Sequence, residues 1–168
     1  MTGVPALRDV LRRYASIPII VEMKVDTEQM GLAVVEEIKM AGAVGRVCAA
    51  GFGGRSLRAV REALPALATS ASQWEVRLAL YRTWARWPVR DAPYGGYQVP
   101  ERAGTLRVVS PQFIRYAHDA GFKVQVWTVD DPDDMIRLLE WGVDALITNR
   151  PDLAVEVRDR FMKRSRLA

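Results

Sequence analysis

The chain is poor in the residue types from which disulfide frameworks and metal clusters are built. Its 168 residues include a single cysteine, Cys48, and a single histidine, His118. One cysteine excludes an internal disulfide framework and any zinc site made from several cysteines. Long apolar runs are also missing: none approaches the roughly 18 residues that a membrane-spanning helix needs, and residues 1–13 hold no continuous apolar segment of signal-peptide length. We therefore expect no transmembrane segment and, by default, a cytoplasmic location.

The overall composition is that of an ordinary globular protein. Hydrophobic residues make up 49% of the chain and charged residues 26%. At roughly 150 residues per domain, the length predicts a single domain over residues 1–168. Two stretches lean basic, residues 77–107 and the tail 158–168, although the net charge is only +4 and charges of both signs are mixed along most of the chain. Because no zinc-finger spacing or aromatic RNA-binding signature accompanies these stretches, we expect no nucleic-acid partner.

Helical and strand patterns alternate along the sequence. The apolar periodicity predicts five buried strands, each followed by a helix, and no hairpin between strands. The predicted strands cover residues 17–23, 44–49, 67–71, 123–129 and 144–148. Strands that alternate with helices indicate an α/β fold with a parallel sheet covered by helices. An open doubly wound sheet and a barrel fit this pattern equally well.

The segment 73–108 departs from this regular alternation. Trp74, Leu78, Tyr81 and Trp84 have the spacing of one helix face. The prolines and glycines that follow, from Pro88 to Pro100, predict an irregular excursion instead of a further strand. Such a long connection is often functional in a compact domain.

Charged residues stand at the end of the first predicted strand. Glu22 and Lys24 alternate with Met23, so both side chains point to the same face. The carboxyl ends of buried parallel strands are where α/β folds place their active sites. Glu22 could bind a divalent cation through oxygen, and Lys24 could neutralise a phosphate. An ion pair at the rim of the sheet explains the spacing equally well.

Other residues give weaker signals. Trp127 shares one strand face with Gln125 and could line a pocket, although a tryptophan is more often simply half-buried. His118 lies in a helical stretch, with no carboxylate obviously aimed at it, which favours a structural or surface role. Cys48 is expected to be a small buried thiol. Residues 51–54 lack the lysine of a phosphate loop, so their backbone amides could at most form an anion nest.

Three segments together resemble the glycerophosphodiester phosphodiesterase family. The strand that carries Glu22 and Lys24 looks like that family's strand ending in Glu-x-Lys. The run 117–129, which ends in Trp-Thr-Val, looks like its helix-into-strand segment, and the run 142–152, with Thr-Asn-Arg-Pro, looks like its closing signature. These segments follow the family's order, and the resemblance extends over residues 7–153.

The resemblance implies a fold, a reaction and site residues. The family's fold is a TIM (β/α)8 barrel, and its reaction is the metal-dependent hydrolysis of glycerophosphodiesters to glycerol 3-phosphate and an alcohol. By resemblance, Glu22 is a ligand of the divalent metal (Ca²⁺ or Mg²⁺), Lys24 is the electrostatic partner of the phosphate, and Trp127 lines the substrate pocket. Phe52 sits where the family tends to have Ser-Phe, and Gly51 replaces that serine here.

The family's amino-terminal catalytic segments have no counterpart in this sequence. Members carry a His-Arg segment, a Glu-x-Asp strand and a second histidine, which supply the general acid and base and the other metal ligands. Because five of eight barrel units need about 156 residues, the length fits a partial barrel of about five parallel strands. We therefore expect the chain alone to be inactive or strongly impaired and to bind metal weakly or not at all.

The exposed edges and uncovered interior of a partial barrel have a further consequence. They favour self-association or a partner that completes the barrel. The alternative to a truncated enzyme is a non-catalytic phosphate-binding or subunit-interaction module derived from the same family, which would use Lys24 and the basic segment 73–108.

Overall fold

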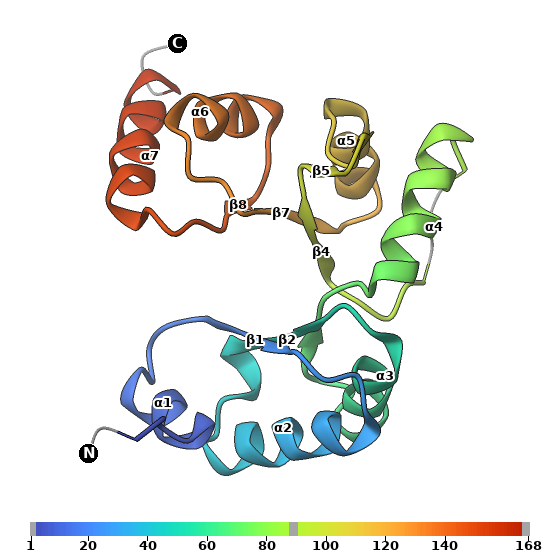
Figure 1. The fold of residues 1–168 in the computed structure, drawn as a ribbon, viewed down its shortest axis with the longest axis vertical. Helices are drawn as coiled ribbons and strands as arrows, with labels where there is room; N and C mark the ends of the chain where they lie inside the picture. Colours follow the sequence, from blue (N-terminus) through green and yellow to red (C-terminus); the bar gives the residue numbers. More distant parts are fainter. Residues whose placement is uncertain (1–2, 88–90, 166–168) are drawn as a thin grey trace. The chain divides into compact units, whose positions relative to one another are not determined.

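The computed structural model describes residues 3–87 and 91–165, which divide into two compact units. Unit 1 holds the described residues 3–77 and 91–95, and unit 2 holds 78–87 and 96–165. Each unit contains a three-stranded parallel sheet, with the order β1-β2-β3 in unit 1 and β4-β7-β8 in unit 2 (Figure 1). The α/β class with parallel strand–helix units is thus confirmed, and neither sheet is closed on itself. The single domain over 1–168 stays a prediction.

In unit 1, three helices cover one face of the sheet (Figure 1). Its elements are α1 (Leu7–Arg13), β1 (Ile19–Met23), α2 (Glu28–Met40), the short 3-10 helix η1 (Val44–Arg46), β2 (Val47–Gly51), α3 (Gly54–Ala63), β3 (Ala68–Thr69) and the beginning of α4 (Gln73–Trp84). The apolar core between sheet and helices includes Leu11, Met23, Val35, Ile38, Ala49, Leu57 and Val60.

Local signals account for how α2 forms and packs in unit 1. The side chain of Thr27 caps the helix, since its hydroxyl oxygen accepts a hydrogen bond of 3.2 Å from the amide of Met30. Gly31 allows α2 to pack closely on α3, because a Cβ atom at this position would lie 2.5 Å from the carbonyl oxygen of Ser56. The strands that follow these helices are therefore held against a rigid layer.

Unit 2 repeats this one-sided arrangement with α5, α6 and α7 (Figure 1). Its elements are the remainder of α4, β4 (Gly96–Pro100), β5 (Arg102–Ala103), β6 (Leu106–Arg107), α5 (Pro111–Asp119), β7 (Lys123–Trp127), α6 (Pro132–Trp141), β8 (Ala145–Leu146) and α7 (Pro151–Ser165). Buried Tyr97 of β4 packs against Phe113 and Phe122, with ring centroids 5.2 and 5.7 Å apart.

The prediction of five strands is wrong, because β4 adds a sixth parallel strand inside the segment 73–108. Tyr97 and Val99 are buried and alternate with half-buried neighbours, the two-residue period of a strand. Gly96 and Pro100 hid this strand in the sequence, since both residue types normally interrupt strands. Among the described residues β4 pairs with β7 alone and so lies at the edge of its sheet, which is where a strand tolerates proline.

The rest of 73–108 is also more regular than expected. The helix predicted from the spacing of Trp74, Leu78, Tyr81 and Trp84 is confirmed as α4, but these side chains lie on its exposed face. The expectation of no hairpin is wrong: β5 and β6 pair antiparallel, and Gly104 makes the turn between them with a φ of +62°. Over the described ranges 3–87 and 91–165, no helix combines the length and apolar character needed to cross a bilayer.

Candidate functional site

Glu22 and Lys24 form an exposed ion pair at the carboxyl end of β1. The Nζ atom of Lys24 lies 2.8 Å from Oε1 of Glu22, and the two side chains are 76% and 39% exposed. Between them, Met23 is buried in the core of unit 1. The alternation predicted from the sequence is therefore confirmed: the core takes Met23, and the charged pair points away from it.

Phe52 follows β2, the strand next to β1. In the register of the two strands Glu22 lies opposite Ala50, two residues before Phe52. The Phe52 ring is about half exposed, and its carbonyl oxygen accepts a hydrogen bond of 3.0 Å from the amide of Gln73 at the start of α4. Parallel pairing thus places the ends of β1 and β2, and with them Glu22, Lys24 and Phe52, at one edge of the sheet.

A second acidic residue of this edge, Asp26, has a structural role that the sequence did not reveal. Its Oδ1 atom accepts hydrogen bonds from the amides of Arg55 and Ser56, at 2.8 and 2.9 Å, and from the Ser56 hydroxyl at 3.2 Å. The hydrogen bond from the Ser56 amide is the main reason why the pKa of Asp26 lies below its usual value. Gly53 is required here, because a Cβ atom would overlap the Asp26 carboxylate.

Asp26 also changes the interpretation of the glycine-containing turn 51–54. That turn was expected at most to form an anion nest from its backbone amides. The carboxylate of Asp26 occupies the two amides that follow this turn, those of Arg55 and Ser56 in the first turn of α3, whereas a nest from the amides of 51–54 stays a prediction. Those two amides are therefore not available to an external phosphate.

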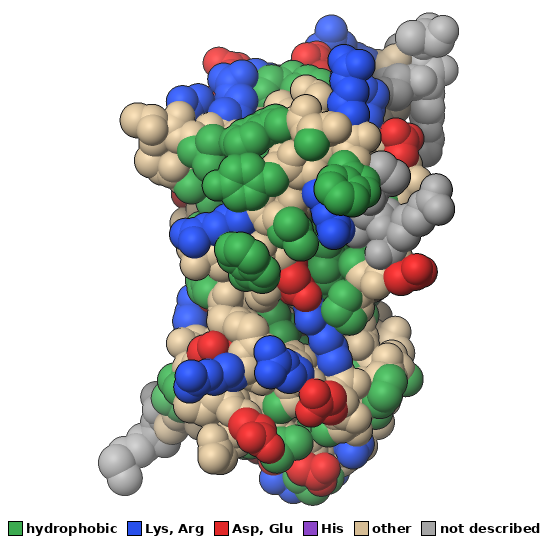
Figure 2. Space-filling view, turned by 90° about the vertical axis from the view of Figure 1, so that its right-hand side faces the viewer, with side chains coloured by type: hydrophobic (Ala, Val, Ile, Leu, Met, Phe, Trp, Pro, Cys, Tyr) green, Lys and Arg blue, Asp and Glu red, His purple; other side chains and the backbone are tan. Residues whose placement is uncertain are grey.

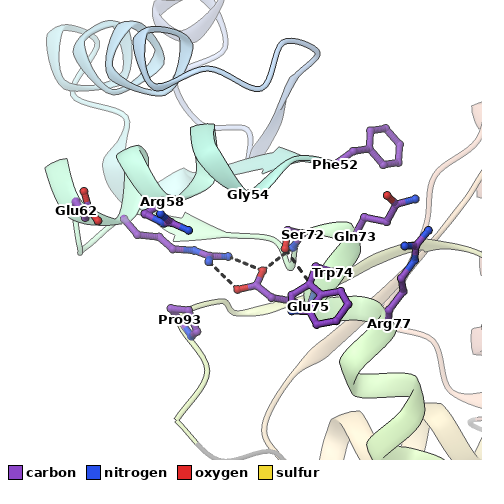
Figure 3. A pocket seen from close by; sticks show the side chains of 11 residues that line it. Phe52, Gly54, Arg58, Glu62, Ser72, Gln73, Trp74, Glu75, Arg77 and Pro93 are labelled. Atoms are coloured by element: carbon purple, nitrogen blue, oxygen red, sulfur yellow. Dashed lines mark hydrogen bonds and ion pairs between the residues drawn. The ribbon is translucent and has the colours of Figure 1, made fainter.

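A pocket of about 670 Å³ opens beside the same edge of unit 1. Its walls come from the turn after β2, from α3 and from the first turn of α4 (Figure 3). Two residues that line it, Arg61 and Glu75, form an ion pair with an N–O distance of 2.8 Å. Glu75 also accepts a hydrogen bond of 2.6 Å from the Ser72 amide. Burial alone would raise the pKa of Glu75, but the hydrogen bond from Arg61 and that from Ser72 lower it overall.

Two arginines of the pocket are not engaged in this ion pair. Arg58 and Arg77 line the pocket together with Phe52 and Trp74 (Figure 3). Among the described residues neither guanidinium has a hydrogen bond or ion pair with a side chain. Guanidinium groups beside aromatic rings suit an anionic ligand that also has an apolar part.

In unit 2, Trp127 is the last residue of β7 and is half-buried. Gln125 lies two residues earlier on the same face, and its buried Oε1 atom has no hydrogen-bond partner among the described residues. Asp130 beyond the strand end accepts hydrogen bonds from the Thr148 hydroxyl at 2.8 Å and from the amide of Asn149 at 2.8 Å. The bond from Thr148 is the main reason for the lowered pKa of Asp130. This carboxylate therefore fixes the turn before α7.

His118 lies at the opposite end of the strands of unit 2. Its Nε2 atom is 2.9 Å from Oδ2 of Asp144, which also accepts a hydrogen bond of 2.8 Å from the amide of Val124 and pairs with Lys123 at 2.9 Å. Lys123 begins β7, and Asp144 directly precedes β8. His118 thus lies at the amino ends of these strands, where parallel folds place stabilising rather than catalytic groups.

The predicted site residues fall into both units: Glu22, Lys24 and Phe52 belong to unit 1, and Trp127 belongs to unit 2. Within the described ranges no group of three His, Cys, Asp or Glu side chains could hold a metal ion. Glu22 offers one carboxylate, which is already paired with Lys24, whereas Ca²⁺ and Mg²⁺ take six or more oxygen ligands. The described residues by themselves therefore do not fit a dedicated site for either cation.

Comparisons with known proteins agree with this arrangement of strands and helices. A protein of Mycobacterium tuberculosis named probable glycerophosphodiester phosphodiesterase 2 is 47% identical over 60 residues, which cover 36% of this chain and 23% of that protein. A solved glycerophosphodiester phosphodiesterase from Parabacteroides distasonis matches with a TM-score of 0.73 and 21% identity, over 96% of this chain and 65% of that one.

Two further solved structures show the same fold. The glycerophosphodiester phosphodiesterase of Agrobacterium tumefaciens has a TM-score of 0.69 and 18% identity, over 93% of this chain and 62% of that one. A phosphodiesterase of Oleispira antarctica, solved with the product sn-glycerol-3-phosphate, has a TM-score of 0.57 and 19% identity, over 79% and 50% of the two chains. The chain thus spans less than two thirds of the length of these relatives.

A family model also matches most of the chain. The model of the glycerophosphoryl diester phosphodiesterase family matches residues 4–153 of the 168 residues. This range includes both strand ends with predicted site residues, the pocket of unit 1 and the turn before α7. The chain belongs to the glycerophosphoryl diester phosphodiesterase family.

Proposed function

We propose that this chain supplies the phosphate-binding and substrate-lining part of a site that hydrolyses glycerophosphodiesters to glycerol 3-phosphate and an alcohol. The observation that supports it most is the ion pair of Glu22 and Lys24 at the carboxyl end of β1. Because both side chains are exposed and neither supports the core, the pair does little for stability and is available to a ligand.

The proposed roles follow from the chemistry of each side chain. Lys24 approaches a phosphate oxygen and offsets the charge that develops during hydrolysis. Phe52 lines the substrate, because it presents a half-exposed ring directly after β2 in unit 1. The same role for Trp127, which belongs to unit 2, stays a prediction from the family resemblance. Glu22 offers one carboxylate to a divalent cation, Ca²⁺ or Mg²⁺, whose other ligands must come from outside the described residues.

For proton transfer, the chain has no histidine at the proposed site that could act as general acid or base. Its one histidine, His118, is held by Asp144 at the amino ends of β7 and β8. General acid–base catalysis requires a titrating group within hydrogen-bond reach of the substrate. We therefore propose that the chain alone binds the phosphate group of a glycerophosphodiester but does not hydrolyse the diester.

A second candidate function is a non-catalytic phosphate-binding module. It is favoured by Arg58 and Arg77, which line the pocket of unit 1 without an acidic partner among the described residues. The two candidates differ in what restores activity: a partial enzyme gains it when the missing segments are supplied, and a binding module does not.

The decisive experiment is a chimera. The part of the Parabacteroides distasonis protein that has no counterpart in this chain is fused to it, and release of glycerol 3-phosphate from glycerophosphocholine is measured with Mg²⁺ or Ca²⁺. We expect release by the chimera and none above background by the chain alone. Glu22→Gln and Lys24→Met in the chimera should each lower the rate at least 100-fold.

The control is the matched pair Glu36 and Lys39 on α2, an exposed ion pair of 3.6 Å. Glu36→Gln and Lys39→Met should leave the rate unchanged. A folded chimera without activity, or equal losses in both pairs, would contradict the proposal. If the chimera does not fold, titration of the chain with glycerol 3-phosphate decides: Lys24→Met must weaken binding at least tenfold and Lys39→Met must not.

A further inference from the structure

Helix α4 has two apolar faces, and only one of them is covered. Its inner face buries Ala79, Leu80 and Thr83 in unit 2. The opposite face carries Leu78, Tyr81 and Trp84, which are 37%, 62% and 55% exposed, and Trp87 follows at 67%. We call these four residues the aromatic face. A surface helix normally turns polar residues outward, so this face needs a partner.

The aromatic face is firmly held and is not a frayed end. The carbonyl of Thr83 accepts a hydrogen bond of 3.3 Å from Gln112 on α5, and the amide of Trp87 donates to the carbonyl of Arg82 at 2.9 Å. The Tyr116 hydroxyl, also from α5, donates to the carbonyl of Trp87. Tyr81 and Trp84 contact each other edge to face, with ring centroids 5.6 Å apart. The rings are therefore presented outward in a fixed arrangement.

Every charged residue between positions 76 and 90 is basic. Arg82 lies within the helix and Arg86 lies two residues beyond its end, and the sequence contains no Asp or Glu from 76 to 90. Figure 2 views the side on which α4 lies in Figure 1 and shows hydrophobic side chains next to those of lysine and arginine. Tryptophan and tyrosine beside arginine are the combination that settles at a membrane–water interface.

We propose that the aromatic face of α4 binds the surface of a membrane that contains anionic phospholipids, with the helix lying in the plane of the interface. Leu78, Tyr81, Trp84 and Trp87 enter the headgroup region, and Arg82 and Arg86 pair with lipid phosphates. A second copy of the chain fits this face less well. A two-fold contact through it would bring the arginines of both copies together with no carboxylate from residues 76–90 to neutralise them.

The test uses the 168-residue chain and sucrose-loaded vesicles that are sedimented with bound protein. Vesicles of phosphatidylcholine with about a third phosphatidylglycerol are compared with vesicles of phosphatidylcholine alone. We expect binding that requires phosphatidylglycerol and falls as salt is added. Tyr81→Ser with Trp84→Ser should lower the partition coefficient at least tenfold, and Arg82→Gln with Arg86→Gln should lower it about fivefold for each arginine removed.

Matched control variants lie on α7. Arg158→Gln with Arg160→Gln removes two exposed arginines, and Val155→Ser with Met162→Ser removes two exposed apolar side chains. Both should change the partition coefficient less than twofold. Tyr81→Phe with Trp84→Phe keeps the aromatic surface and should bind like the unaltered chain, which separates loss of the face from loss of the fold.

Three results would overturn the proposal. The first is an unaltered chain that does not sediment with either vesicle. The second is an equal loss of binding in the α4 and α7 variants. The third is a chain whose mass at sedimentation equilibrium is that of a dimer and falls to that of a monomer in the Tyr81/Trp84 serine variant, which would assign the aromatic face to a second copy instead of a membrane.

Discussion

The ends of β1 in unit 1 and of β7 and β8 in unit 2 use acidic residues in opposite ways. In unit 2 both carboxylates have structural partners. Asp130 accepts hydrogen bonds from the turn before α7. Asp144 accepts a hydrogen bond from a backbone amide of β7 and also contacts Lys123 and His118. In unit 1, Asp26 has a comparable role on α3, but among the described residues Glu22 pairs only with the exposed Lys24. Glu22 is thus the exception among these carboxylates.

This difference teaches how to separate structural from functional acidic residues. A carboxylate that accepts backbone hydrogen bonds stabilises the fold, and its pKa falls because the charged form is favoured. A carboxylate at a strand end that supports no backbone group contributes little to folding, so a reason for its presence must be sought in binding. Substituting these residues one at a time tests whether the two kinds of carboxylate differ in this way.

The largest effect is expected from Asp144→Ala. This change leaves the amide of Val124, whose residue is fully buried, without its hydrogen bond and removes the partner of Lys123 and His118. We expect a loss of about 2–3 kcal/mol in the free energy of unfolding, measured by urea denaturation. Asp152→Ala is the control, since Asp152 is exposed and pairs with Arg150 on the surface; its effect should stay below about 0.5 kcal/mol.

A smaller loss is expected from Asp26→Ala. The first turn of α3 loses the acceptor for the amides of Arg55 and Ser56, which is equivalent to losing a helix cap. Because Asp26 is exposed and water can replace it in part, we expect about 1–2 kcal/mol in the same denaturation experiment. An unchanged midpoint would mean that Asp26 does not hold α3, and the contrast with Glu22 would collapse.

The dependence of stability on pH tests the same difference between Glu22 and the structural carboxylates Asp26 and Asp144, without truncating a side chain to alanine. The pKa of Asp26 and that of Asp144 are lowered in the folded state: for Asp26 chiefly by the Ser56 amide, and for Asp144 by hydrogen bonds that outweigh the opposing effect of burial. The unfolded chain therefore binds more protons at acidic pH. The stability that these groups add is complete above their unfolded pKa of about 4 and is lost as the pH falls through the folded values.

In the unaltered chain we expect the urea concentration at the unfolding midpoint to decrease as the pH is lowered below about 4. In the double variant Asp26→Asn/Asp144→Asn this decrease should be less steep. Glu22→Gln is the control and should keep the slope of the unaltered chain. Equal slopes for the unaltered chain and the double variant would contradict the assignment of both carboxylates.

The smallest effect on stability is expected at the proposed site itself. Glu22→Gln and Lys24→Met remove an exposed ion pair and should change the free energy of unfolding by less than about 0.5 kcal/mol each. Combined with their large expected effect on the chimera's activity, this would mark the pair as functional. A loss of stability near that of Asp26→Ala would instead make Glu22 a structural residue.

What the sequence predicts well here is what local contacts determine. Thr27 as the cap of α2 and Asp131 as the cap of α6 could both be predicted, because a cap and its amides lie within a few residues. Gly142, which ends α6 with a φ of 93°, is similarly local. β4 was missed because Gly96 and Pro100 interrupt strands in general, and only its place at a sheet edge makes them acceptable.

For the candidate site, too, the sequence predicts only what local spacing determines. That Glu22 and Lys24 share a face follows from the two-residue period of a strand. That Asp26 binds the first turn of α3 does not, because the two segments are about 30 residues apart and meet only through the pairing of β1 with β2. The spacing of Glu22, Lys24 and Asp26 at alternate positions was the available signal, but it does not distinguish the carboxylate that stabilises the helix from the one that is exposed.

The register of β1 and β2 gives the molecule a built-in reporter. Cys48 lies opposite Ile20, and both alternate with residues of the core, so the chain's one thiol is on the sheet face away from the helices. Burial raises the pKa of this thiol, which keeps alkylation slow near neutral pH. Any segment that covers this face, whether in a chimera or in a complex, should slow alkylation further, so timed thiol labelling provides a footprint of whether the sheet is covered.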